Sequence, residues 1–206
     1  MPFFSILIPT RNRSNLLQKA IRSVLKQDWE DYELVVSDND SSDSTRQVVE
    51  SFDPSKIRYI RTPQFLSSAD NWEFARRHAS GEYIWLIGDD DYLVPGSLRE
   101  AAAVIRERSP DVLAAGSVAY YDPSYPDSKF SNCVEYRSFT GKVIDVDAVT
   151  VIKAYFEFRR SIYPPHPSAT CFSRSITDRI ASEFGAFFAP PFPKVRDGSD
   201  CLSCGS

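Results

Sequence analysis

Three consecutive aspartates, Asp89, Asp90 and Asp91, follow an apolar run that begins at Tyr83. Adjacent carboxylates repel one another, and this repulsion is poorly screened at the end of a buried strand. Carboxylate oxygens are the ligands that Mg²⁺ and Mn²⁺ prefer, commonly in company with a phosphate. Alternate side chains of an extended chain point in opposite directions, so Asp89 and Asp91 are expected to share a face. The triplet predicts a divalent-cation site; the alternative interpretation is a solvated acidic turn before the helix that contains Pro95.

Two further polar segments follow other apolar runs and carry groups suited to a nucleotide. Arg11 and Arg13 come after the first apolar run, and guanidinium groups suit phosphate or base contacts. Asp38 and Asp40 come after the second, where an acidic side chain can accept hydrogen bonds from a ribose hydroxyl. Each segment also has a simpler interpretation, as solvated arginines or as an ordinary polar turn. Only the combination of the three segments indicates a site.

Strand and helix patterns alternate along the first 120 residues. The expected strands are 3–8, 32–38, 57–61, 82–88 and 111–120, and the expected helices are 14–25, 44–52, 69–79 and 95–105. Ser14 is expected to cap the first of these helices. Such alternation predicts βαβ units and a mainly parallel sheet, which is an α/β fold. Because ligands of these sheets bind at the carboxyl ends of the strands, the three polar segments are expected to converge on one crevice.

The pattern is looser after residue 120. A helix is expected over 146–158, and a short strand or loop precedes a helix that begins near Ser173. The segment 190–206 has no periodicity and is predicted to be a loop or a disordered tail. Its Cys201 and Cys204 form a single C-x-x-C without a second pair, which argues against a zinc site.

Composition narrows the class of protein. The 206 residues fit one domain, and 42% apolar with 25% charged residues is ordinary for a globular protein. The net charge of -4 and the lack of a basic block give no reason to propose nucleic-acid binding. No apolar run approaches 18 residues, so no transmembrane segment is expected. No signal peptide is recognisable, and the unevenly spaced cysteines suit a reducing compartment, so a cytoplasmic protein is expected. The G-x-G-x-x-G and G-x-x-x-x-G-K-[ST] patterns of dinucleotide dehydrogenases and P-loop ATPases are absent.

The order and spacing of these motifs resemble those of the family-2 glycosyltransferases, nucleotide-sugar-dependent enzymes with a GT-A fold. The similarity runs through "FSILIPTRNR", "ELVVSDNDSSDST" and "SADNWEFARRHASGEYIWLIGDDDYLVPGSL", so it covers residues 3–120. It implies a Rossmann-like, mainly parallel sheet flanked by helices. Residues 1–120 would form the nucleotide-sugar-binding core, and 121–206 a looser acceptor-side region of the same domain.

The resemblance also implies roles for individual residues. Those that it places at the nucleotide are Pro9, Thr10, Arg11, Arg13, Asp38, Asp40, Asn71, Asp89 and Asp90. Asp91 and Asp89 would hold Mg²⁺ or Mn²⁺, and Asp90 is a further ligand candidate because the family often has aspartate where this chain has Gly88. The ion would stabilise the leaving diphosphate as a Lewis acid. A carboxylate would deprotonate the acceptor hydroxyl, which attacks the anomeric carbon and inverts it.

The sequence departs from the family where that base is expected. The segment "APPFPKVRDGSDCLSCGS" has no aspartate directly after its prolines, so Asp197 and Asp200 are the nearest candidates. Glu183 is a further candidate, on a predicted helix. The chain is also short for the family, and we expect a truncated or altered C-terminus.

The partners implied by the resemblance are a nucleotide diphosphate sugar donor and a glycan or lipid-linked acceptor, in polysaccharide or cell-envelope glycan synthesis, with peripheral membrane contact. Two alternatives stay open. The first is a catalytically impaired nucleotide-sugar-binding module. The second is a nucleotidyltransferase, although "PTRNRSN" lacks the glycine-rich basic loop of that class.

Overall fold

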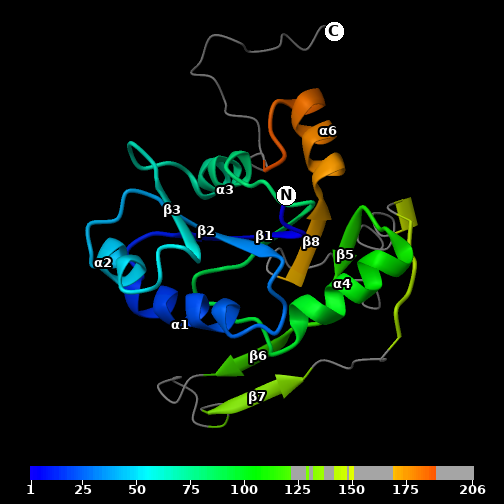
Figure 1. Cartoon of the computed structure of the whole chain (residues 1–206), viewed down its shortest axis with the longest axis horizontal. Coiled ribbons are helices and arrows are strands. Elements are labelled where there is room, and N and C mark those ends of the chain that lie inside the picture. The colour runs from blue at the N-terminus through cyan, green and yellow to red at the C-terminus, as the bar shows by residue number, and fades with distance from the viewer. Residues whose placement is uncertain (122–128, 130–131, 137–141, 148, 151–168, 189–206) are drawn as a thin grey trace, which may run out of the picture.

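The structure is a computed structural model that describes residues 1–121, 129, 132–136, 142–147, 149–150 and 169–188 (Figure 1). Its strands are β1 (Phe4–Thr10), β2 (Tyr32–Asp38), β3 (Ile57–Arg61), β4 (Tyr83–Leu86), β5 (Val112–Ala114), β6 (Val118–Tyr121), β7 (Cys133–Tyr136) and β8 (Thr170–Ser173). Its helices are α1 (Ser14–Leu25), α2 (Thr45–Glu50), α3 (Ser68–Arg77), α4 (Ser97–Arg108) and α6 (Arg174–Phe184).

The main sheet has the strand order β3-β2-β1-β4-β8-β5. Neighbours from β3 to β4 are parallel, whereas β8 runs antiparallel to both β4 and β5. The predicted α/β fold with a mainly parallel sheet is therefore confirmed. The chain continues from β1 to β2 on one side and later enters β4 on the other side. The carboxyl ends of β1, β2 and β4 consequently flank a topological switch point, where open α/β sheets place their ligands.

Helices cover both faces of this sheet (Figure 1). Phe4, Ile6 and Ile8 of β1 pack in one apolar cluster with buried side chains of α1 and α4. Leu7 points to the opposite face and packs with Ala75 of α3, because successive strand residues alternate between faces. Because both faces of the sheet are covered at β1, most residues of this strand are apolar.

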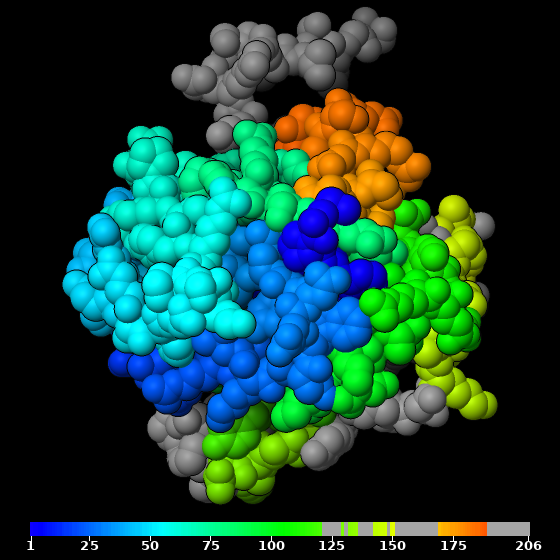
Figure 2. Space-filling model, viewed as in Figure 1, coloured from blue at the N-terminus to red at the C-terminus, as the bar shows by residue number. Residues whose placement is uncertain are grey.

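The chain after residue 168 joins these same layers. Strand β8 fills the place between β4 and β5, and α6 lies beside α3 (Figures 1 and 2). The Asp178 carboxylate on α6 accepts a hydrogen bond from Arg76 of α3 at 2.7 Å. The sheet therefore extends beyond residue 120, while the assignment of 121–206 to the acceptor stays a prediction.

The predicted single strand over 111–120 is wrong. Its first part is β5, which pairs with β8 in the main sheet, and its second part is β6, which pairs with β7 in a separate two-stranded sheet. The two parts are separated by residues 115–117, where the chain leaves the main sheet. The sequence does not reveal this division, because β8, the partner of β5, comes from a segment more than 50 residues later.

Several predicted boundaries also shift. Helix α4 begins at Ser97, after Pro95 and after Gly96, whose φ is 85°. Ser14 is the first residue of α1 and not its capping side chain; its amide donates to Asp43 Oδ2 at 3.0 Å. The helix expected over 146–158 and the tail expected over 190–206 lie almost wholly outside the described residues.

Candidate functional site

A cavity of about 380 Å³ opens at the carboxyl edge of the parallel strands. The residues that line it are Pro9, Thr10, Arg11, Arg13, Asn39, Ser68, Asn71, Trp72, Leu86, Ile87, Gly88, Asp89, Asp90 and Asp91. Loops after β1, β2 and β4 meet here, so the predicted convergence of three polar segments is confirmed. The volume is within the range of small-molecule sites.

The acidic triplet lies in a turn rather than in an extended segment. The amide of Asp91 donates to the Gly88 carbonyl at 3.2 Å, and the Gly88 amide donates to Asp91 Oδ2 at 3.2 Å. Asp89 is buried and accepts a 2.7 Å hydrogen bond from Thr10 Oγ1 and a 2.9 Å bond from Arg13 Nη1. The expectation that Asp89 and Asp91 share a face assumed extended backbone, whereas residues 89–90 form a turn, and all three aspartates line the cavity.

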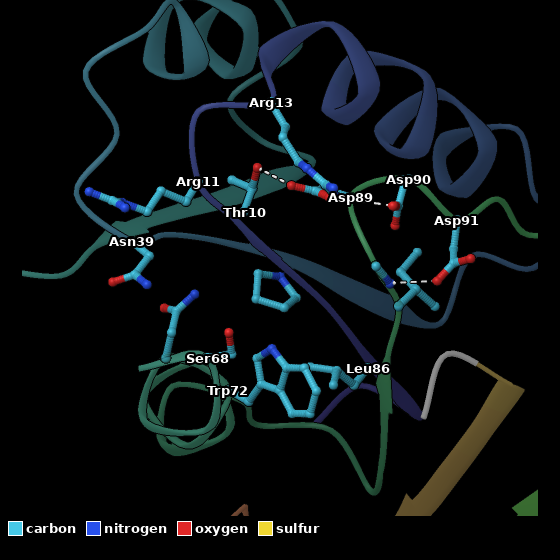
Figure 3. A pocket seen from close by; sticks show the side chains of 14 residues that line it. Thr10, Arg11, Arg13, Asn39, Ser68, Trp72, Leu86, Asp89, Asp90 and Asp91 are labelled. Carbon is cyan, nitrogen blue, oxygen red and sulfur yellow. Dashed lines mark hydrogen bonds and ion pairs between the residues drawn. The ribbon is translucent and has the colours of Figure 1, made fainter. Parts of the chain in front are cut away.

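Arg13 joins two members of the triplet (Figure 3). Its Nη1 atom lies 2.9 Å from Asp89 Oδ1 and 2.9 Å from Asp90 Oδ2. The hydrogen bond to Asp89, and then the charge of that carboxylate, raise the pKa of the Arg13 guanidinium above its ordinary value. The positive group thus compensates part of the repulsion that three adjacent carboxylates create.

Polar contacts between two loops hold the segment that carries Arg13. Asn12 has a φ of 53°, a left-handed conformation that asparagine tolerates better than most residues. Its amide donates to Ser41 Oγ at 2.9 Å, and its Oδ1 accepts from the Ser42 amide at 2.7 Å. The loops after β1 and β2 are therefore fixed relative to each other.

Asp38 and Asp40 do not line this cavity. Asp38 is fully buried and accepts hydrogen bonds from the Ser41 amide, the Tyr59 hydroxyl and Arg61 Nη1. Burial and the hydrogen bond to Asp38 raise the pKa of Tyr59 to about 12. Arg61 also donates to Asp40 at 2.6 Å, so it links both carboxylates. Their contact with a nucleotide stays a prediction.

The wall opposite the triplet includes residues that the sequence reasoning missed. Asn39 stands between the two predicted aspartates, and its side chain both donates to and accepts from the backbone of Leu66. Ser68 and Trp72 project from α3 toward the cavity (Figure 3). The signal for Asn39 is its place directly after a strand, whereas a tryptophan on a helix, such as Trp72, is more often a packing residue. It both packs against Phe188 and lines the cavity.

Asn71, by contrast, was expected from the sequence and does line the cavity. It is buried, and its Oδ1 accepts a 2.7 Å hydrogen bond from Ser37 Oγ of β2. This bond fixes α3 against the sheet at the edge where the cavity opens.

The acidic residues fit a divalent ion that is shared with a phosphate. Among the described residues, no three His, Cys, Asp or Glu side chains gather into a cluster that could hold a metal by themselves. Magnesium sites at phosphates, however, commonly use only one or two carboxylates of the protein. Oxygens of Asp89 and Asp90 already converge on one cationic nitrogen of Arg13, so the donor set suits such an ion.

The candidate bases are not placed by the structure. Asp197 and Asp200 lie outside the described residues. Glu183 is exposed on α6 and does not line the cavity.

The fold and the cavity define an α/β protein with a ligand cleft at the switch point of a mainly parallel sheet. The chain belongs to glycosyl transferase family 2, whose model matches residues 5–174. The fold is the GT-A fold of such enzymes. Membership of this family speaks against the nucleotidyltransferase alternative.

Curated relatives of the chain include bacterial glycosyltransferases. It is 40% identical over 101 residues to the GalNAc(5)-diNAcBac-PP-undecaprenol beta-1,3-glucosyltransferase of Campylobacter jejuni. The matched region covers 48% of this chain and 33% of the relative. It is 35% identical over 94 residues to the UDP-Glc:alpha-D-GlcNAc-diphosphoundecaprenol beta-1,3-glucosyltransferase WfgD of Escherichia coli, covering 46% and 37%. The chain therefore matches about a third of the length of these two relatives.

Solved structures show the same arrangement. The S. aureus TarS 1-349 structure in complex with UDP is 31% identical, with a TM-score of 0.50 over 54% of this chain and 34% of that chain. The mannosyltransferase PcManGT from Pyrobaculum calidifontis, in complex with GDP-Man and Mn²⁺, is 17% identical, with a TM-score of 0.60 over 87% and 46%. The second likeness concerns the fold alone. A helix able to span a bilayer is absent from the part of this chain that the structure describes.

Proposed function

We propose that this chain is the donor-binding part of an inverting glycosyltransferase that uses a nucleoside diphosphate sugar together with Mg²⁺ or Mn²⁺. One observation carries the proposal. Carboxylate oxygens of Asp89 and Asp90 converge within a cavity of about 380 Å³, at the switch point of a GT-A sheet. A negatively charged donor would need a cation in such a place.

The roles of individual residues follow from their positions. Arg11 and Arg13 line the cavity and offer guanidinium groups to the diphosphate. Asp89 and Asp91 are the ligand candidates for the ion, and Asp90 joins them because its carboxylate converges with that of Asp89. When bound, the ion supplies the Lewis-acid charge that stabilises the leaving diphosphate. Asn39, Ser68 and Trp72 would face the donor from the opposite wall.

The acceptor is proposed to be a glycan or lipid-linked glycan of the cell envelope. Two relatives carry names that specify undecaprenol-linked acceptors, and S. aureus TarS is named for a poly(ribitol-phosphate) acceptor. The residues that would contact the acceptor are proposed to lie in 121–206. Transfer with inversion also requires a base, for which Asp197 and Asp200 are the candidates.

A nucleotide-sugar-binding module without catalysis is the second candidate. The observation that favours it is the absence of any carboxylate other than the triplet among the described residues that line the cavity. Hydrolysis or transfer assays with radiolabelled UDP-GlcNAc, UDP-Glc and GDP-Man distinguish the two functions. Replacing both Asp197 and Asp200 by Asn should abolish transfer and leave donor binding intact.

Ligand-induced thermal shift tests the proposed site. The full chain should melt at a higher temperature with UDP or GDP plus Mn²⁺ than with either component alone, because ligands that bind the native state stabilise it. Asn substitutions at Asp89, Asp90 and Asp91, made one at a time, should remove the metal-dependent part of this shift. Asp53→Asn serves as the matched control, since Asp53 is exposed and lies outside the cavity. A chain that binds neither nucleotide, with or without the metal, would contradict the proposal.

A further inference from the structure

Arg13 occupies the position that a cation at the triplet would take. A single atom, Nη1, lies 2.9 Å from an oxygen of Asp89 and 2.9 Å from an oxygen of Asp90 (Figure 3). A divalent ion bound by the same two oxygens would sit about 2.0–2.6 Å from each of them. The guanidinium nitrogen and the ion therefore compete for one place, both sterically and by charge.

The two partners in this contact differ in their freedom to move. The Asp89 side chain is 7% exposed and is also held by the 2.7 Å hydrogen bond from Thr10 Oγ1. The Arg13 side chain is 50% exposed among the residues that the structure describes. The backbone of Arg13 is fixed, because its carbonyl accepts hydrogen bonds from the amides of Leu16 and Leu17 at the start of α1. The guanidinium can consequently leave the carboxylates without any change in the fold.

We propose that Arg13 is a displaceable counter-ion, which neutralises Asp89 and Asp90 until a divalent cation replaces it. This inference rests on the proposed function, because it requires the ion to bind at the triplet. After displacement the guanidinium reaches the diphosphate of the donor, since Arg13 lines the same cavity and planar guanidinium groups pair well with phosphate oxygens. Arg13 is thus a positioning residue that couples binding of the metal to binding of the nucleotide.

Two opposite effects of removing the guanidinium follow. Without nucleotide, the ion no longer has to displace a positive group, so Arg13→Gln should bind Mn²⁺ more tightly than the unsubstituted chain. We expect about a tenfold gain, which corresponds to about 1.4 kcal/mol. In the unsubstituted chain, the diphosphate of UDP draws the Arg13 guanidinium away from the carboxylates and so favours the ion. Arg13→Gln has no guanidinium to draw away, so UDP should raise the Mn²⁺ affinity less in this variant than in the unsubstituted chain. Coupling between two ligands is reciprocal, so Mn²⁺ should also raise the UDP affinity less.

The experiment measures free Mn²⁺ by electron paramagnetic resonance during titration of the full chain, first alone and then with saturating UDP. Arg13→Lys keeps a positive charge at this position and should bind Mn²⁺ within about threefold of the unsubstituted chain. Arg46→Gln is the matched control, because Arg46 pairs with Glu50 at 2.7 Å on the exposed face of α2 and does not line the cavity. Its Mn²⁺ affinity without nucleotide should be unchanged.

The outcomes separate this inference from the proposed function. Mn²⁺ affinity that is equal or lower in Arg13→Gln, with normal binding in the unsubstituted chain, would overturn the counter-ion role and leave the metal site standing. Tighter Mn²⁺ binding with undiminished coupling to UDP would overturn the link between Arg13 and the diphosphate. Failure of every variant to bind Mn²⁺, with or without UDP, would overturn both the counter-ion role and the metal dependence.

Discussion

Glu73 on α3 is the centre of a buried group of charges next to the cavity wall. Its two carboxylate oxygens accept hydrogen bonds from Arg76 at 2.8 and 2.9 Å, and from Arg77 at 3.2 Å. Oε2 also accepts hydrogen bonds from the backbone amides of Phe187 and Phe188 at 3.1 and 3.3 Å, and these bonds hold the segment after α6 against α3. The side chains of Glu73 and Arg76 are only 6% and 8% exposed.

The substitution Glu73→Gln should lower the free energy of unfolding by about 3 kcal/mol. Breaking a buried ion pair by neutralising one partner typically costs about 3–5 kcal/mol. We take the lower end because Arg76 keeps its bond to Asp178. Arg76→Gln should have a similar effect. The double variant should cost less than the sum of the two by at least about 1.5 kcal/mol, since it leaves no unpaired buried charge.

Urea denaturation at pH 7, followed by circular dichroism, measures the free energy of unfolding of the unsubstituted chain, the two single variants and the double variant. Glu50→Gln is the matched control, because Glu50 pairs with Arg46 at 2.7 Å on the exposed face of α2. An exposed pair of this kind contributes little, so no measurable change is expected. A loss below about 1 kcal/mol for Glu73→Gln, together with additive effects in the double variant, would refute the reasoning.

The contribution of Glu73 to the stability of the fold should depend on pH. Burial acts to raise the pKa of Glu73, but the hydrogen bonds from Arg76 and the Phe188 amide outweigh it and lower the pKa below its ordinary value. A lowered pKa contributes stability above the unfolded value of about 4.3, and this contribution is lost as the pH falls through the folded value. The stability difference between the unsubstituted chain and Glu73→Gln should therefore be full at pH 6 and shrink below about pH 4.

Three other predictions concern the scaffold. Gly81→Ala should destabilise the chain by about 2–3 kcal/mol in urea denaturation, because the new Cβ would lie 2.6 Å from a backbone nitrogen of β1. Gly185→Ala, with open space but a φ of +86°, should cost only about 1 kcal/mol; equal losses would contradict the steric argument. Asp43→Ala should lower the free energy of unfolding by about 1–2 kcal/mol in the same assay, because the Asp43 carboxylate accepts hydrogen bonds from the first backbone amides of both α1 and α2. An unchanged denaturation midpoint would show that water replaces the carboxylate. Burial raises the pKa of Cys171 to about 12, whereas Cys133 is exposed. Iodoacetamide at pH 8 should therefore modify Cys133 and spare Cys171, as measured by mass spectrometry of the peptides. Equal labelling of the two cysteines would show that β8 opens.

The amino-acid sequence alone determined the elements of the core and their order. Strands β1, β2 and β4 were recognisable because each contains a short apolar run, and α1 because its buried residues recur at helical spacing. These signals are local, so they survive without knowledge of the fold. The rule that ligands bind at the carboxyl ends of parallel strands then placed three polar segments together, and the cavity lies there.

Only the tertiary structure decided the pairings. It inserted β8 between β4 and β5, placed Arg13 between Asp89 and Asp90 across 76 residues of chain, and turned Asn39 rather than Asp38 into the cavity. Hydrogen bonds, burial and the energies of charges depend on distances in space, and residues remote in sequence set those distances. A linear pattern can therefore predict which groups gather at an edge, but the contacts among them are fixed only when the chain is folded.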